Sequence, residues 1–278
     1  MKKAVIIQGL ITPQTLNLVK ELHKFCDDET TIVVATWEGQ EKKFALPKNL
    51  DRCHALFLSD PGRGPKVWRQ KRPENNYWRM TMGVEYAFNL LDDIYGETED
   101  KGIVLKVRSD MKCTTDPFAL YRDLPVTEEP FSSYLSNKIW AEANRKRNEG
   151  GKWSSGAAIL SDWLFMGRFE DVRKWFTVDK NIVRTIAPRL RIVERLFLIA
   201  NYIQATNPKN TDDIIREVRT FKRRKNRHGS PCPKERKIIK DAIQYASLSL
   251  ELGMLCLRYP EVRSNFLYLD KIDEEKND

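Results

Sequence analysis

The segment Thr31–Thr36, TIVVAT, constrains the fold most, because apolar side chains occupy both of its alternating faces. A strand of this kind is buried on both sides, as in a parallel sheet covered by helices. A second strand is expected at Ala4–Gln8, and between the two Thr15–Phe25 carries apolar residues at helical spacing. Strand, helix and strand in this order predict an α/β fold with a nucleotide-binding half.

The next segments continue this pattern. Ala55–Ser59 is a shorter third strand, followed by a loop rich in Pro and Gly at residues 61–65. Asn75–Tyr95 is a long helix that leads into a fourth strand at Gly102–Asp110. The apolar face of that helix is expected to consist of Met82, Tyr86, Leu90 and Ile94.

Further elements follow a long interval. Ala157–Leu160 is predicted to be a strand, and Ser161–Gly167 a turn with a second strand or a short helix. Glu170–Phe176 and Arg191–Ile203 are helices, the second with an apolar stripe.

The character of the chain changes after residue 206. Residues 207–213, NPKNTDD, are a turn-rich connector, and a basic run then precedes a helix at Lys234–Arg258. One or two helices rarely supply a core of their own. Residues 207–278 are therefore expected to form a basic α-helical appendage packed on a domain of residues 1–206.

The net charge and the cysteine content indicate which kind of partner and which cellular compartment to expect. The net charge of +9 over 278 residues favours a polyanionic partner or an anionic surface. Residues 222–240 are strongly basic, which predicts either a solvated surface or peripheral contact with an anionic membrane. Five scattered cysteines without a Cys-x-x-Cys pair favour a reducing compartment. We therefore expect a cytoplasmic protein. No stretch approaches the roughly 20 apolar residues that span a bilayer, so any membrane contact is expected to be peripheral.

Charged residues gather at the end of the fourth strand. Lys106 and Arg108 share one face by strand alternation, and Asp110 follows them. Ligands of open α/β sheets bind outside the carboxyl ends of the strands. There Asp110 would hold a divalent cation while the two basic residues neutralise nucleotide phosphates. The alternatives are a buried ion-pair network without chemistry, or solvated charges beside a Ser-Asp turn.

The first two strands also end in polar residues. Gln8 and Gly9 would present backbone groups to a nucleotide, and Thr36, Trp37 and Glu38 would hold its base or ribose. Taken singly, Gly9 is equally a turn residue and Trp37 a packing residue. Neither GxxxxGK[ST] nor GxGxxG occurs in the chain, which argues against a P-loop enzyme and a dinucleotide oxidoreductase.

Several separated blocks together resemble a known family. In chain order they are VIIQG, VVATWEGQE, NNYWR, VLKVRSD, ILSDWLFMG and ERLFLIANYI, spanning Ala4 to Ile203. They resemble the WavE lipopolysaccharide-synthesis family, whose members look like glycosyltransferases of GT-A fold. The resemblance implies a GT-A-like sheet, a UDP- or GDP-sugar donor, a surface glycan or glycolipid acceptor, and Mn²⁺ or Mg²⁺ as cofactor.

The chain departs from the family pattern at two places. The family's helix entry looks like Asn-x-x-Arg-Gln, whereas here Met80 follows Arg79, the residue expected to contact the donor. In place of Asp-x-Asp the chain has Arg108-Ser109-Asp110. A cation at Asp110 would therefore need donor phosphates, waters or a distant Asp to complete its coordination.

Two carboxylates are candidate bases for deprotonating an acceptor hydroxyl. Asp162 is preferred because it follows an apolar strand and precedes Trp163, which can stack on a sugar; partial desolvation would raise its basicity. Glu194 is the second candidate. Both have structural alternatives, since Ser161-Asp162 commonly caps a turn or helix and Glu194 lies near a helix start.

Two other functions compete with glycosyl transfer. Nucleic-acid binding through the basic C-terminal part is disfavoured, because aromatic residues are not interleaved with the basic run, and no nucleic-acid partner is expected. Nucleotidyl or phosphoryl transfer on the same sheet remains open, and the released product distinguishes it from sugar transfer.

Overall fold

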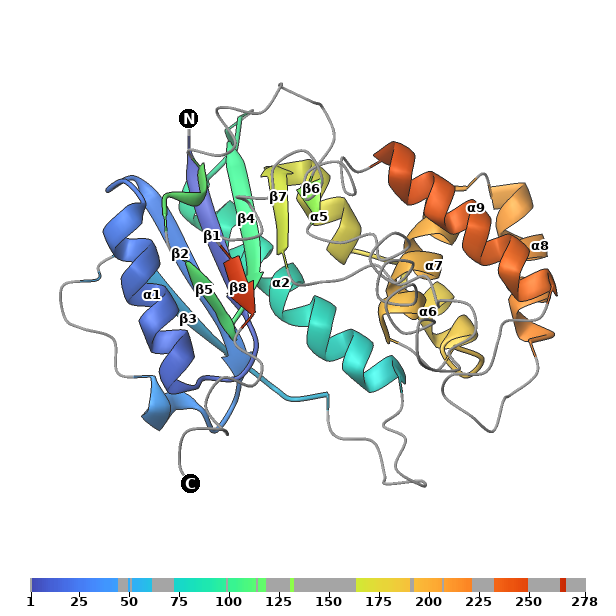
Figure 1. Ribbon diagram of the computed structural model, residues 1–278, viewed down its shortest axis with the longest axis horizontal. Helices are drawn as coiled ribbons and strands as arrows, with labels where there is room; N and C mark the ends of the chain where they lie inside the picture. Colours follow the sequence, from blue (N-terminus) through green and yellow to red (C-terminus); the bar gives the residue numbers. More distant parts are fainter. Residues whose placement is uncertain are drawn as a thin grey trace, which may run out of the picture.

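The computed structural model describes residues 2–44, 50, 52–61, 73–98, 100–113, 115–118, 131–132, 164–190, 193–206, 208–221, 233–249 and 266–268. Its centre is a six-stranded sheet in the order β3-β2-β1-β4-β7-β6 (Figure 1). The strands are β1 (Lys3–Gln8), β2 (Thr30–Trp37), β3 (Cys53–Leu58), β4 (Ile103–Arg108), β6 (Phe131–Ser132) and β7 (Leu164–Arg168).

Most of this sheet is parallel. β1 pairs in parallel with β2 and β4, and β2 pairs in parallel with β3. β7 runs antiparallel to β4, and β6 antiparallel to β7. A second sheet joins β5 (Met111–Cys113) to β8 (Phe266–Tyr268).

Helices cover both faces of the main sheet. The helices are α1 (Pro13–Phe25), α2 (Pro73–Tyr95), α5 (Phe169–Phe176), α6 (Lys180–Ile186), α7 (Val193–Ala205), α8 (Pro208–Arg219) and α9 (Pro233–Ser249), with a 3₁₀ turn at Glu41–Lys43. Residues of α1 share one core with one face of the sheet. Residues of α2, α5 and α7 share another core with the opposite face. The expected α/β fold, a mostly parallel sheet flanked by helices, is confirmed.

Every residue of β2 is buried, as the sequence predicts for this segment. Val33 and Ala35 lie in the core shared with α2, whereas Ile32 and Val34 lie in the core shared with α1. The apolar side chains of β2 therefore alternate between the two cores, one on each face of the sheet.

The long helix α2 is present as predicted, and Leu90 of the predicted face packs against the core, but Tyr86 and Ile94 do not. Tyr86 and Ile94 are 46% and 40% exposed, whereas Val84, Ala87 and Phe88 are fully buried. The helix packs against β1 and β2 of the sheet and against the helices α5 and α7, and these neighbours decide which of its residues are buried.

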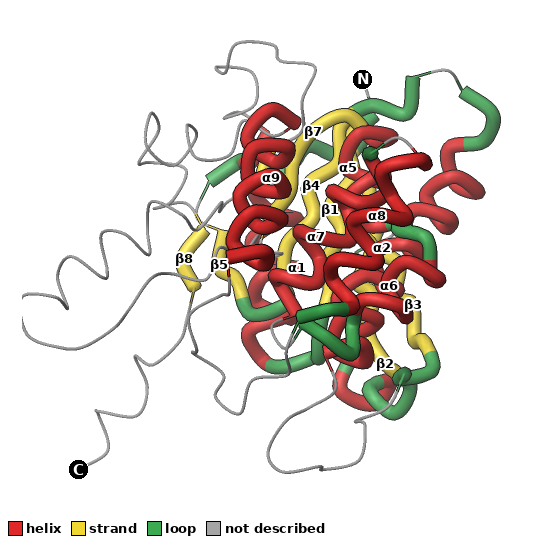
Figure 2. Tube along the Cα trace, turned by 90° about the vertical axis from the view of Figure 1, so that its right-hand side faces the viewer, coloured by secondary structure: helices red, strands yellow, loops and turns green. Residues whose placement is uncertain are grey.

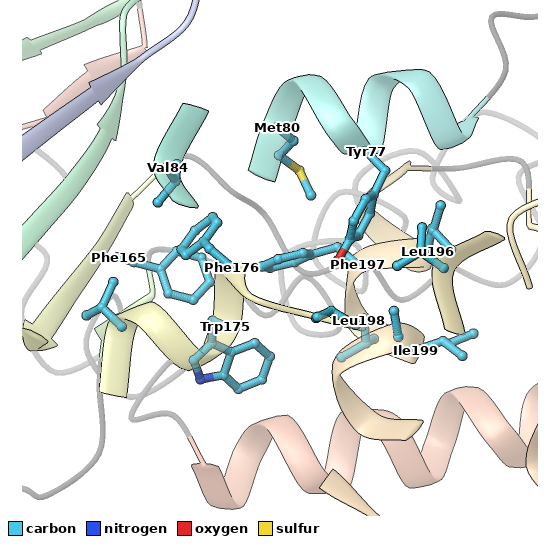
Figure 3. Close-up of a cluster of buried hydrophobic side chains, with 14 of the residues drawn as sticks. Tyr77, Met80, Val84, Phe165, Trp175, Phe176, Leu196, Phe197, Leu198 and Ile199 are labelled. Carbon is cyan, nitrogen blue, oxygen red and sulfur yellow. The ribbon is translucent and has the colours of Figure 1, made fainter. Parts of the chain in front are cut away.

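An aromatic cluster joins α2, β7, α5 and α7 (Figure 3). The Phe165 and Phe176 rings meet edge to face at 5.0 Å between centroids, and the Phe176 and Phe197 rings lie 5.4 Å apart. Trp175 is 6.2 Å from Phe197 and stacks on Tyr245 of α9 at 5.7 Å. Such contacts tie the helices beyond β7 to the sheet.

The predicted connector at residues 207–213 is wrong, because α8 begins at Pro208 and runs through these residues. A proline is tolerated in the first helical turn, where its missing N–H costs no hydrogen bond. Ile214, Ile215 and Val218 of α8 pack into the core shared with α7 and α9, and this packing outweighs the polar composition of the first turns. Figures 1 and 2 show α6 to α9 gathered at one side of the molecule.

Several predicted elements lie outside the described residues: the strand at Ala157–Leu160, most of the loop at 61–65, the basic residues 222–230, and the end of the last helix beyond Ser249. For residues 161–167 the sequence left open a second strand or a short helix, and the structure has a strand, β7, at Leu164–Arg168. The helix α6 was not predicted from the sequence. Within the part of the chain that the structure describes, none of the helices has the length and apolar character that crossing a bilayer requires.

Candidate functional site

The parallel strands end at one edge of the sheet, and the chain changes direction there. From β1 it passes to β2 and β3 on one side, and then to β4 on the other side of β1. The carboxyl ends of β1 and β4 therefore enclose a topological switch point, where open α/β sheets bind their ligands. Gly9 follows β1 at this point, and Ser109 and Asp110 follow β4.

The backbones of Gly9 and Ser109 approach each other closely at the switch point. Gly9 has φ +144°, and a Cβ built there would lie 2.2 Å from Ser109 Oγ. The Ser109 N–H donates to the Gln8 carbonyl at 3.0 Å, and the Thr15 hydroxyl donates to the Ser109 carbonyl at 3.2 Å. The end of β4 is thus tied both to β1 and to the first turn of α1, which Thr12 caps.

Arg108 and Asp110 form a two-point ion pair beside this approach. Arg108 Nε donates to Asp110 Oδ1 at 3.0 Å, and Arg108 Nη2 donates to Asp110 Oδ2 at 2.7 Å. Both side chains remain partly exposed. The pair brings together two of the predicted donor-binding residues, with the arginine occupying both oxygens of the carboxylate.

Lys106 is fully buried on β4, two residues before Arg108 on the same strand. Its register partners are Ile6 on β1 and Phe165 on β7, and its Nζ lies 5.4 Å from the centre of the Phe176 ring. The ammonium therefore lies beneath the edge, within the aromatic core, and contributes positive charge to a low-dielectric region.

Gln8 connects the switch point to α2. Its Nε2 donates to the Arg79 carbonyl at 2.8 Å. The Arg79 guanidinium in turn donates from Nε to Asp60 Oδ1 at 2.7 Å and from Nη2 to Asp60 Oδ2. Asp60 follows β3, so this second arginine pair lies at the carboxyl end of a strand that β2 separates from β1.

The sequence reasoning missed Asp60 and Ser59. Both directly follow β3 at the edge already expected to bind the ligand, and that position was the available signal. The Ser59 hydroxyl donates to Glu38 Oε1 at 3.0 Å, which joins the ends of β2 and β3.

The three residues predicted at the end of β2 differ in accessibility. Thr36 and Trp37 are 1% and 6% exposed, and Glu38 is exposed. Among the described residues, Thr36 Oγ1 has no hydrogen-bond partner. Trp37 therefore packs in the interior, and Glu38 is the residue of this group that faces solvent.

The side chains of the two predicted bases are not among those that the structure describes. Asp162 lies outside the described residues. Glu194 is the second residue of α7, but its side chain is not among those described. Their assignment as bases stays a prediction.

The residues at this edge do not form a ready cation site. Asp110 offers both oxygens to Arg108, and Asp60 offers both to Arg79. Over the described ranges, no three His, Cys, Asp or Glu side chains lie together in a way that could hold a metal ion. A divalent cation prefers six or more oxygen ligands, and here it would compete with a guanidinium for the first of them.

Comparisons with known proteins give distant likenesses. No protein-family model matches the chain. Over 201 residues, 72% of this chain, it is 21% identical to human aminopeptidase Q, and it spans about a fifth of the length of that relative (20%).

Among solved structures, an active-site mutant of LgtC matches with a TM-score of 0.37 and 11% identity, covering 63% of this chain and 59% of that one. The galactosyltransferase LgtC in complex with donor and acceptor sugar analogs gives 0.36 and 12%, covering 63% and 60%. Mouse xyloside xylosyltransferase 1 gives 0.38 and 10%, covering 73% and 81%. TM-scores of this size carry no inference about function.

Proposed function

We propose that this protein is a glycosyltransferase that moves a sugar from a nucleoside-diphosphate-sugar donor to a glycan or glycolipid acceptor. The observation that carries the proposal is the switch point between β1 and β4, with Gly9 and Ser109 in close approach and Arg108 and Asp110 beside them. A UDP- or GDP-sugar would lie across this edge. The WavE resemblance of the sequence supports a surface polysaccharide or lipopolysaccharide acceptor and a GT-A-like fold.

The edge supplies groups suited to a diphosphate. The absence of a side chain at Gly9 lets Ser109 pack against the end of β1, and the first turn of α1 begins beside it without an acidic residue. Arg108 provides planar N–H donors that match phosphate oxygens. Lys106 adds positive charge from beneath, at 0% exposure.

In the transfer step the acceptor oxygen bonds to the anomeric carbon. The bond between that carbon and the diphosphate oxygen breaks, and its electron pair leaves with the nucleoside diphosphate. The acceptor proton passes to a carboxylate, for which we propose Asp162 first and Glu194 second. Asp110 and Asp60 each offer both oxygens to an arginine, so this step assigns no role to a divalent cation held by them.

The basic residues 222–240 suggest where the protein would meet a glycolipid acceptor. In the described part of this segment, Lys237 and Lys240 of α9 are exposed. We propose that the segment meets anionic lipid at a cytoplasmic membrane surface, where each basic residue contributes about 1 kcal/mol.

The test is incubation of the full chain with a panel of UDP- and GDP-sugars, with and without Mn²⁺, followed by analysis of the products. Release of UDP or GDP supports sugar transfer, whereas release of pyrophosphate indicates nucleotidyl transfer and contradicts it. Arg108→Ala should remove donor turnover. Arg216→Ala is a matched control, because Arg216 forms an exposed ion pair with Asp213 on α8, away from the sheet edge.

A further inference from the structure

The strand β3 forms one edge of the main sheet. Within the described part of the chain it pairs in parallel with β2, and the sheet order places no strand on its other side. The strand at the opposite edge, β6, has two residues in the part that the structure describes, whereas β3 has six. An edge strand of this length presents a row of backbone N–H and C=O groups with which another strand can pair.

Hydrogen bonds on the β2 side identify which backbone groups of β3 point outward. The Arg52 and Leu58 carbonyls each accept a backbone N–H from that side, at 2.9 Å. These two residues are an even number of positions apart, and the backbone groups of successive residues alternate between the two sides of a strand. The N–H and C=O groups of Ala55 and Phe57 therefore point away from β2.

The strand β3 carries none of the features that commonly protect an exposed edge. Its sequence, CHALFL, contains no proline, lysine, arginine or carboxylate. Its register with β2 continues over all six residues without a bulge. Prolines, charged side chains, bulges and short length are the usual means by which proteins prevent pairing at an edge. The edge formed by β3 is therefore regular and open to pairing.

Apolar side chains accompany this edge on the sheet face that α2 covers. Leu56 of β3 and Leu90 of α2 are both half-buried and pack against the core of that face. Tyr86 and Ile94 lie one helical turn before and after Leu90, and they are 46% and 40% exposed. Since α2 contacts β3, the exposed apolar strip of Tyr86, Leu90 and Ile94 belongs to the helix that adjoins the edge.

A second copy of this chain supplies the complement of the edge. Residues opposite each other in an antiparallel pair share a face of the sheet, so a two-fold axis between two copies of β3 passes through a residue. With Leu56 on the axis, Ala55 of one chain lies opposite Phe57 of the second copy. These are the residues whose backbone groups point outward, so each such pair exchanges two hydrogen bonds.

The charges at the two ends of β3 are compatible with this arrangement. Arg52 precedes the strand and Asp60 follows it, so the same register places Arg52 opposite Asp60 of the second copy. Like charges, which destabilise directly opposed positions, do not meet. Each residue already has an ion-pair partner in its own chain, so the interface does not depend on a new salt bridge.

We propose that this chain forms a two-fold dimer through antiparallel pairing of β3 with β3 of a second copy, and that the strip of Tyr86, Leu90 and Ile94 packs beside it. The two main sheets are then joined edge to edge. Because β2 separates β3 from β1, the carboxyl ends of β1 and β4 lie outside this interface. The inference does not depend on the proposed function.

The first experiment is sedimentation velocity of the full chain between about 1 and about 100 µM, in about 0.15 M salt, where charges beyond about 8 Å are screened. We expect a species of twice the chain mass at the upper concentrations. A single species of one chain mass over the whole range overturns the proposal. A series of ever larger oligomers also overturns it, because a two-fold interface closes at two chains.

Two variants test whether β3 and α2 form the interface. Ala55→Pro removes an outward N–H and leaves the hydrogen bonds to β2 in place, so it should weaken the dimer by about tenfold or more. Ile94→Lys should also weaken it, and it keeps the test valid if the proline variant fails to fold, because Ile94 is exposed. Leu10→Lys is the matched control, since Leu10 is 50% exposed and lies outside the strip. A dimer that Ile94→Lys leaves unchanged, or that Leu10→Lys weakens equally, contradicts the proposed surface.

Disulfide cross-linking tests the register. Leu56→Cys places two thiols opposite each other on the axis, in a non-hydrogen-bonded pair with about 4.5 Å between Cα atoms, which a disulfide can span. The described native cysteines, Cys26, Cys53 and Cys113, are buried. Under mild oxidation we expect Leu56→Cys to form a covalent dimer, and Leu10→Cys to cross-link no more than wild type. Equal cross-linking of all three proteins would place the contact elsewhere and overturn the proposal.

Discussion

Ser109 lies against Gly9 so closely that a β-carbon on Gly9 would be 2.2 Å from the Ser109 hydroxyl oxygen. The contact joins the ends of β1 and β4, the two strands that enclose the switch point. The site therefore depends on a residue without a side chain at position 9, both for its backbone angle and for the space that Ser109 fills.

Gly9→Ala should lower the free energy of unfolding by about 2 to 5 kcal/mol, because it adds strain at positive φ to an overlap with Ser109. Adding Ser109→Gly to this variant should recover about 1 to 3 kcal/mol, since it removes the overlapping atoms. Gly39→Ala is the matched control: Gly39 has φ +83° but open space around it, so its cost should be about 1 kcal/mol. Urea unfolding of the wild-type protein and the three variants measures these values, and equal losses for Gly9→Ala and Gly39→Ala would contradict the close approach.

Gln8→Met should lower the free energy of unfolding by about 1 kcal/mol, because the Arg79 carbonyl loses the donor at 2.8 Å while the volume is kept. The same change should weaken nucleotide binding, since Gln8 links α2 to the switch point. Gln204→Met serves as control for nucleotide binding, because Gln204 of α7 lies away from the edge. Its Nε2 donates to the Thr177 carbonyl at 3.0 Å, and its Oε1 accepts from the Asp179 N–H at 2.7 Å. Urea unfolding and calorimetry check both effects, and an unchanged nucleotide affinity in Gln8→Met would argue against this link.

Tyr77→Phe should leave stability unchanged or raise it by up to about 1 kcal/mol. The Tyr77 hydroxyl is buried near Phe197 and, among the described residues, has no hydrogen-bond partner (Figure 3). Burial, followed by the nearby Glu85 carboxylate, raises the pKa of Tyr77, so the hydroxyl is buried in its neutral form.

Tyr95→Phe is the matched comparison and should lower stability by about 1 kcal/mol, because the Tyr95 hydroxyl donates to the Lys3 carbonyl at 3.0 Å. Thermal unfolding of the two variants tests the difference. A larger loss for Tyr77→Phe than for Tyr95→Phe would mean that the Tyr77 hydroxyl has a partner after all.

Stability should fall as the pH rises above 9. Burial raises the pKa of the Cys53 thiol from 9.0 to about 12. Above pH 9 the thiol ionises in the unfolded chain but stays protonated in the folded protein, so this contribution is complete below pH 9 and is lost between pH 9 and 12. Cys26 and Cys113 follow the same direction, with burial as the first cause in each.

Cys53→Val removes the titrating group and isolates its effect. Between about pH 8 and pH 10.5 the wild-type protein should lose up to about 2 kcal/mol more than this variant, because each pKa step corresponds to about 1.4 kcal/mol. Urea unfolding at the two pH values measures the difference. Parallel losses in both proteins would show that Cys53 ionises alike in the folded and unfolded states.

The extent of sequence-based prediction varies with the kind of element. β1, β2 and α1 were predicted from local patterns, because apolar runs and helical spacing are properties of the segment itself. The α8 helix was missed, since residues 207–213 are polar and turn-like in isolation and their helix is held by packing of Ile214 and Val218. The packed face of α2 was misassigned for a similar reason, because its neighbours decide which side is covered.

The candidate site, too, could be predicted from the sequence only in part. The sequence by itself determined that Gln8 and Arg108 end parallel strands and that Gly9 and Asp110 come after them, because strand order along the chain and apolar patterning are local properties. Only the tertiary structure decided that Arg108 holds Asp110, that Arg79 holds Asp60, and that Gln8 joins α2 to the edge. Gln8 and Arg79 are 71 positions apart and Arg79 and Asp60 are 19 apart, and no local pattern specifies distances between such segments. Arg108 and Asp110 are close in the chain, but their side-chain directions depend on the turn that the close approach to Gly9 fixes.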